Sequence, residues 1–168
     1  MNGKPHHSAK VVCFTRNRSE SQIRLFLACR AARKHGKEVP TSSNWILDSG
    51  ASANMTCRRE ILTSYRPLTP PKRIVIGDGR SIDAIGIGRA TLEVHVSNGN
   101  YRHTILQDVY HVPDLNANLL SVQHLTERGF EVTFDGSECK ILANGEIAAI
   151  TRKQFSLYIL EVSPHKTA

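Results

Sequence analysis

The residues best suited to chemistry lie together at Trp45–Ser52, where the sequence reads Trp-Ile-Leu-Asp-Ser-Gly-Ala-Ser. Three apolar residues predict a short buried strand that delivers the carboxylate of Asp48 at its end. The hydroxyl of Ser49 can hydrogen-bond near that carboxylate and fix its orientation. Gly50 permits a tight turn in which backbone N–H groups approach the carboxylate oxygens. Ala51 is small enough to leave the space above the turn open, so this stretch is the candidate catalytic loop.

Other readings of these residue types are weaker. Cys57 and Cys139 have no evident basic partner, which argues against a thiol nucleophile. No histidine has an assigned place beside Ser49 or Ser52, so a serine nucleophile has no base. The alternative for Asp48 is an ordinary solvated aspartate in a turn, with no chemistry at all.

The length and composition indicate one ordinary domain with a core. The chain has 168 residues, of which 40% are hydrophobic and 22% charged. No apolar run approaches the roughly 20 residues that a membrane-spanning helix needs. No apolar signal-peptide core follows Met1, so the cytoplasm is the expected compartment.

The charge is unevenly distributed along the chain. The net charge of +7 lies in residues 1–43, with nine Lys and Arg against two Asp and Glu, while residues 44–168 hold thirteen of each. The basic segment is either a linker or an arm that contacts nucleic-acid phosphates. Within it, Ser19 to Lys34 predicts a short helix, and the break at 39–43 predicts the boundary of a domain spanning 44–162. Residues 163–168 are expected to form a tail.

From Trp45 onward the pattern is typical of short strands separated by turns. The run 73–76, the turn around Gly77-Asp78-Gly79 and the run 81–86 predict a hairpin. One helix is predicted at 118–128. Further strands are predicted at 91–96, 101–112, 130–134, 139–142, 147–150 and 155–162. The fold class that follows is all-β, a small closed barrel or a sandwich with one short helix.

The order of these pieces resembles a known family. The catalytic loop is followed by Ile76-Gly77-Asp78-Gly79, then by the run from Tyr110 to Val122, and finally by Gly129–Phe134. This resembles the protease region of a copia-type LTR retrotransposon Gag-Pol polyprotein, over about residues 44–162. The run from Tyr110 to Val122 is more specific than the Asp-Ser-Gly-Ala tetrad.

The resemblance implies a retropepsin-like closed β barrel and an aspartic endopeptidase. In that family one chain supplies one aspartate, and Asp48 heads the only Asp-Ser-Gly or Asp-Thr-Gly in this sequence. Two copies of Asp48 would therefore meet across a homodimer. Such a pair shares one proton and activates a water molecule. The family implies no cofactor and no metal.

The resemblance also assigns supporting residues. Ser49, Gly50 and Ala51 would hold the active-site loop rigid. Ile76, Gly77, Asp78 and Gly79 correspond to a flap that closes over an extended peptide. Asn118, Leu119 and Leu120 would pack behind the loop and begin the helix. The implied substrate is the element's own polyprotein, cut in the cytoplasm or within virus-like particles.

A second reading belongs to another class. His7 and Cys13 resemble the back half of a retroelement zinc knuckle, but two ligands cannot close a tetrahedral zinc site. Together with the basic residues 1–43, this remnant favours the alternative of a non-catalytic, retroelement-derived dimerisation or RNA-binding module. A weak RNA contact through residues 1–43 is compatible with either reading.

Overall fold

The structure is a computed structural model that describes residues 9–10, 23–25, 43–77, 79–97, 99–154 and 156–163. Nearly all of its regular structure is strand, which confirms the predicted all-β class, and α2 (Val122–Glu127) is its single α-helix among the described residues. A short 3-10 turn spans Arg59–Ile61. The strands are β1 (Ala9–Lys10), β2 (Ile23–Leu25), β3 (Trp45–Asp48), β4 (Met55–Thr56), β5 (Leu62–Ile76), β6 (Ser81–Ser97), β7 (Asn100–His111), β8 (Asn118–Ser121), β9 (Glu131–Phe134), β10 (Glu138–Ala143), β11 (Glu146–Gln154) and β12 (Leu157–Leu160).

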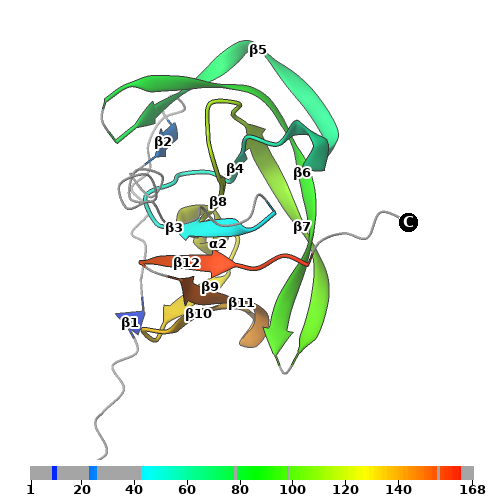
Figure 1. Cartoon of the computed structure of the whole chain (residues 1–168), viewed down its shortest axis with the longest axis vertical. Coiled ribbons are helices and arrows are strands. Elements are labelled where there is room, and N and C mark those ends of the chain that lie inside the picture. Colours follow the sequence, from blue (N-terminus) through cyan, green and yellow to red (C-terminus); the bar gives the residue numbers. More distant parts are fainter. Residues whose placement is uncertain are drawn as a thin grey trace, which may run out of the picture.

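All of these strands join one sheet in the order β1-β9-β10-β11-β12-β3-β8-β4-β7-β6-β5-β2. The long strands β5, β6 and β7 run along the top and right of the molecule, while shorter strands fill its centre and bottom (Figure 1). The predicted closure of the barrel is wrong, because the order of described strands has two ends. Closure needs edge strands that pair along their length, and β1 and β2 have only two and three residues. Instead β6 packs against β11, and a single β-bridge joins Val94 to Val162.

The core consists of two hydrophobic clusters, and strand β3 contributes to both. Trp45 and Leu47 belong to one cluster, whereas Ile46 belongs to the other. Alternate residues of a strand point to opposite faces, so β3 is buried on both sides. This explains why its sequence is a continuous apolar run rather than an alternating one.

The predicted hairpin exists and is longer than the pattern indicated. Strand β5 runs for 15 residues and β6 for 17, with register shifts between Thr63 and Arg66 and between Pro67 and Lys72. The turn between the strands uses Gly79 at φ +85°, a conformation that glycine adopts at little cost. The hairpin therefore ends in a glycine-containing turn that two long strands with irregular pairing support.

The predicted helix at 118–128 is wrong over its first four residues. Asn118–Ser121 form strand β8, which pairs in parallel with β3, and α2 begins only at Val122. Parallel pairing with a buried strand overrides the helical periodicity of this segment. Ser121 then caps the helix, accepting the backbone N–H of His124 at 3.0 Å.

The predicted helix from Ser19 to Lys34 is wrong where the structure describes it. Ile23–Leu25 form strand β2, which pairs in parallel with Ile74–Ile76 of β5. A short helix without tertiary packing is marginal in water, and the edge of β5 offers a backbone partner instead. The remaining residues of that prediction, and His7 and Cys13, lie outside the described residues. The boundary between 1–43 and 44–162 stays a prediction.

Candidate active site

Asp48 is the last residue of β3 and is almost fully buried, with 7% of its surface exposed. One carboxylate oxygen, Oδ1, accepts the backbone N–H of Gly50 at 2.7 Å. The other, Oδ2, is buried and has no hydrogen-bond partner within the described part of the chain. A buried polar atom without a partner is uncommon and is frequently found at functional sites. The described residues thus leave one oxygen of Asp48 buried and unsatisfied.

Burial raises the pKa of the Asp48 carboxyl above its ordinary value. Removal from water disfavours the charged form. The backbone N–H groups of Gly50 and Ala51 oppose this shift by stabilising the carboxylate. The pKa of Asp48 therefore reflects a balance in which burial outweighs the two backbone donors.

Ser49, Gly50 and Ala51 form a tight turn next to the Asp48 carboxylate. Gly50 supplies the N–H donor, and Ala51 is buried in the same cluster as Ile46. Ser49 is exposed, and no hydrogen bond joins its hydroxyl to Asp48 among the described contacts. The Gly50 amide therefore orients the carboxylate within one chain, and the role expected of the Ser49 hydroxyl stays a prediction.

Strand β8 lies beside β3, with Asn118, Leu119 and Leu120 opposite Trp45, Ile46 and Leu47. Both leucines are fully buried. The buried Asn118 accepts the Thr56 hydroxyl at 2.6 Å and donates to the Asn44 carbonyl at 3.0 Å. The structure thus places these three residues beside the strand that leads to Asp48, and their supporting role stays a prediction.

Two residues missed by the sequence reasoning also touch the loop. Ser121 lies opposite Asp48 in the β3–β8 register, and its hydroxyl donates to the Ala51 carbonyl at 2.5 Å. Asn54 accepts the backbone N–H of Ser121 at 3.0 Å. A serine directly before a helix is a recognised N-cap signal, and that signal marks Ser121.

The predicted flap lies at the tip of the β5–β6 hairpin. Ile76 ends β5, and Gly77 and Gly79 are exposed in the turn, while Asp78 lies outside the described residues. Ile76 and Ile82, which flank the turn, pack against the same hydrophobic cluster that contains Ala51. The hairpin and the loop of Asp48 therefore share one apolar environment.

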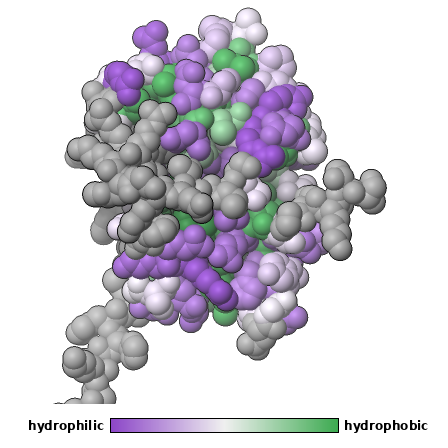
Figure 2. Space-filling model, in the orientation of Figure 1, coloured by the Kyte–Doolittle hydropathy of each residue, from purple (hydrophilic) through white to green (hydrophobic). Residues whose placement is uncertain are grey.

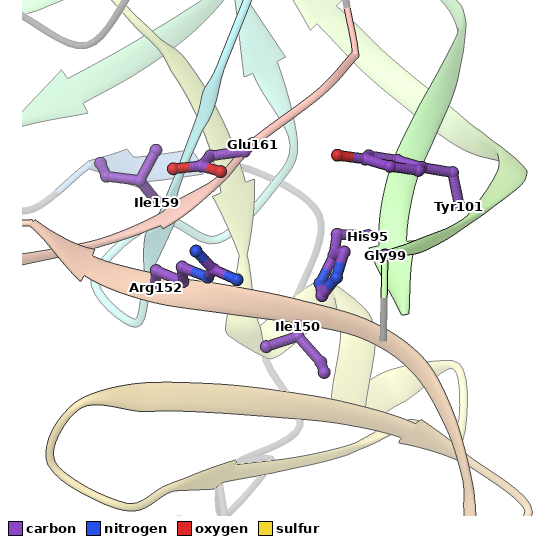
Figure 3. Close-up of a pocket in the computed structure, with 7 residues that line it drawn as sticks. All are labelled: His95, Gly99, Tyr101, Ile150, Arg152, Ile159 and Glu161. Atoms are coloured by element: carbon purple, nitrogen blue, oxygen red, sulfur yellow. The ribbon is translucent and has the colours of Figure 1, made fainter. Parts of the chain in front are cut away.

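A shallow pocket elsewhere does not belong to this site. It lies beside the end of the β6–β7 hairpin and strands β11 and β12, and its polar lining consists of His95, Tyr101, Arg152 and Glu161 (Figure 3). It contains none of the predicted site residues. On the face drawn in Figure 2, hydrophobic and hydrophilic residues are interspersed wherever they are coloured.

Within the described ranges, no three His, Cys, Asp or Glu side chains gather into a possible metal site. The expectation of no metal and no cofactor stays a prediction. No helix in the part of the chain that the structure describes is long and apolar enough to cross a membrane.

Comparison with known families decides what kind of region this is. Residues 45–130 match the family model described as "Pol polyprotein, beta-barrel domain". The chain belongs to that family. The matched range begins with β3 and ends just after α2, so it includes Asp48, the hairpin and β8.

Similar proteins agree with membership in this Pol domain family. The Pol domain is 33% identical over 84 residues to the retrovirus-related Pol polyprotein from transposon RE2 of Arabidopsis thaliana, and 30% identical over 95 residues to that from transposon RE1. These alignments cover 50% and 56% of this chain. A putative transposon Ty5-1 protein of Saccharomyces cerevisiae is 37% identical over 81 residues, or 48% of this chain. The predicted retrotransposon polyprotein origin is confirmed.

The alignments with this chain cover only a small part of the two longer relatives. They cover 5% of the RE2 polyprotein, 6% of the RE1 polyprotein and 49% of the Ty5-1 protein. No solved structure matches the chain significantly.

Proposed function

We propose that this Pol domain is the aspartic endopeptidase of a retrotransposon polyprotein. The observation that carries the proposal is the state of Asp48. Its carboxylate is buried at the end of strand β3, with Oδ1 held by the Gly50 amide and Oδ2 without a partner among the described residues. A buried carboxylate with one unsatisfied oxygen suits a group that completes its hydrogen bonds with a second carboxyl or a bound water in the assembled dimer.

The chain supplies half of the site under this proposal. Only Asp48 stands in an Asp-Ser-Gly sequence, so the second carboxylate comes from Asp48 of another copy in a homodimer. Two close carboxylates do not both ionise, and the pair shares one proton. The raised pKa of Asp48 already inclines each copy toward holding that proton.

The two copies of Asp48 take different parts in the reaction, because one is ionised and the other is protonated. The ionised Asp48 accepts a proton from a bound water as the water oxygen attacks the scissile carbonyl carbon. The protonated Asp48 donates a hydrogen bond to the carbonyl oxygen and stabilises the developing negative charge. The carboxyl that took the proton from water then gives it to the peptide nitrogen as the C–N bond breaks. The amine and the carboxylic acid leave, and the pair again holds one proton.

The β5–β6 hairpin covers the substrate in this proposal. Ile76, Gly77 and Gly79 lie at its tip, and Asp78 belongs to the same proposed flap by its place in the sequence. Ile76 and Ile82, which flank the turn, share a hydrophobic cluster with Ala51 of the loop. Closure over an extended peptide would exclude water other than the nucleophile. The proposed substrate is the element's own polyprotein, processed in the cytoplasm or within virus-like particles. In the same proposal, the basic residues 1–43 make a weak contact with RNA.

Subunit mixing tests the shared site. At low concentration, specific activity rises with protein concentration, because a monomer carries half a site. Excess Asp48→Asn protein added to wild type lowers cleavage further than dilution does, since wild-type subunits enter dimers with a single carboxylate. Activity unaffected by the mutant would contradict the shared site. A stable dimer without cleavage in any mixture would favour the non-catalytic module.

A further inference from the structure

We infer that Ser121 is a positioning residue for Asp48, because its hydroxyl holds the carbonyl of Ala51 and thereby the turn that faces the carboxylate. The inference rests on the proposed endopeptidase function. It gives a residue outside the Asp-Ser-Gly-Ala tetrad a part in orienting the Asp48 carboxylate.

Ser121 lies where the loop, strand β8 and helix α2 meet. It is opposite Asp48 in the parallel β3–β8 register and has no exposed surface. The register fixes its backbone beside the end of β3. Its side chain is therefore adjacent to the turn that begins at Asp48.

The Ser121 hydroxyl makes two hydrogen bonds with different partners. It donates to the Ala51 carbonyl at 2.5 Å and accepts the backbone N–H of His124 at 3.0 Å. The first distance is at the short end of the range for O–H···O hydrogen bonds. A hydroxyl can serve both partners at once, because it has one proton to donate and lone pairs to accept.

The backbone of Ser121 secures the far end of the same loop. Its N–H donates to Oδ1 of the buried Asn54 at 3.0 Å, and the Asn54 carbonyl accepts the N–H of Tyr110 at 2.9 Å. Ser121 thus holds the loop at two points, Ala51 and Asn54. The segment from Asp48 to Asn54 is short, so these two attachments restrict the conformations that its backbone can adopt.

This attachment matters for Asp48 because the loop's amides stabilise its charged form. The N–H groups of Gly50 and Ala51 lower the pKa of the carboxyl, against the larger effect of burial. If the Ala51 carbonyl is released, these N–H groups point less accurately at the carboxylate. The ionised form then loses stabilisation, and the pKa of Asp48 rises further.

The competing explanation is that Ser121 acts only as the N-cap of α2. Substituting an N-cap serine destabilises a helix whatever else it touches. A positioning role predicts an additional change in the pH dependence of catalysis. Ser121→Thr and Ser121→Val form a matched pair, because the two side chains have the same branched shape and only threonine keeps the hydroxyl.

The experiment compares wild type with Ser121→Ala, Ser121→Thr and Ser121→Val in the full chain, by cleavage kinetics across pH. We expect kcat to fall about ten- to a hundredfold in the Ala and Val variants, as for a misplaced catalytic group, with KM within about twofold. The acidic limb of their pH profiles moves to higher pH, and Ser121→Thr stays near wild type. Gln123→Gly, which weakens α2 without touching Ala51, leaves the pH profile unchanged.

A second measurement does not depend on cleavage. Carbon-13 NMR titration of the Asp48 carboxyl gives its pKa in each variant, and we expect a higher value in Ser121→Ala and Ser121→Val than in wild type and Ser121→Thr. Equal kcat, pH limb and Asp48 pKa in the Ala and Thr variants would overturn the role of Ser121. An inactive wild-type dimer would overturn the endopeptidase proposal instead, and the NMR titration would still decide the role of Ser121.

Discussion

Gly86 lies directly against the ring of Tyr65. A Cβ atom placed on Gly86 would come within 2.1 Å of the Cζ and Oη atoms of Tyr65. The ring itself is held in place, because its hydroxyl lies 3.1 Å from Nδ1 of His111 and the guanidinium of Arg59 stacks on its face at 3.8 Å. Because Gly86 has no side chain, the ring of Tyr65 on β5 can pack directly against the backbone of β6.

Gly86→Ala should destabilise the protein by about 1–3 kcal/mol, because the added methyl displaces a ring that has little room to move. Urea unfolding of the single variants and the double variant with Tyr65→Ala measures the effect. In the Tyr65→Ala background the cost of Gly86→Ala should largely disappear. Costs that simply add would contradict this account of the contact.

Asn118→Ala should destabilise the protein by about 2–3 kcal/mol, because it removes an acceptor for Thr56 and a donor to the Asn44 carbonyl, both at a buried site. The free energy of unfolding in urea measures this loss. Asn116→Ala, at an exposed position two residues earlier, is the matched control and should change stability by less than about 0.5 kcal/mol. Equal effects of the two substitutions would refute a supporting role for Asn118.

Asp48→Asn should stabilise the folded protein by about 1 kcal/mol at pH 7, because a neutral amide avoids the cost of burying an ionised carboxylate. The folded pKa of Asp48 is raised above its ordinary value of 3.8, so the folded state binds this proton more tightly than the unfolded state. Wild-type stability from this group is thus present at low pH and is lost as the pH rises through the folded pKa. Urea midpoints at several pH values measure the difference.

The advantage of Asp48→Asn should shrink below pH 3.8, where the carboxyl is protonated in both states. Asp114→Asn, at an exposed aspartate, serves as the control and should show no comparable gain. A destabilised Asp48→Asn protein at pH 7 would show that the ionised carboxylate is well satisfied in the fold.

The parts of the fold set by local residue types could be predicted from the sequence. Trp45–Leu47 forms a continuous apolar run, which predicts a short buried strand, and the glycines at 77 and 79 mark a hairpin turn. The position of Asp48 at the end of β3 follows from the same pattern. These features depend on neighbours in the chain.

The parts set by distant contacts could not be predicted in this way. Asn118–Ser121 has helical periodicity with Val122 and Leu125, yet pairing with β3 makes it a strand. The segment containing Pro67, Pro70 and Pro71 has the composition of a loop, and it lies within β5 as an irregular strand with shifted register. Prolines are tolerated at such edges and bulges. The contact between Ser121 and Ala51 joins residues 70 positions apart, and no local pattern indicates it.

If Asp48 activates water for peptide hydrolysis, cleavage of a flanking polyprotein fragment requires its carboxylate. Wild type, Asp48→Asn and Asp114→Asn are compared between about pH 4 and 7, where a shared carboxylate proton changes the rate. Sedimentation establishes that each protein is dimeric. We predict that wild type and Asp114→Asn cut the fragment at the same sites, and that Asp48→Asn is slower by at least about a hundredfold. Equal cleavage by Asp48→Asn, or no cleavage by a dimeric wild type, would contradict the account.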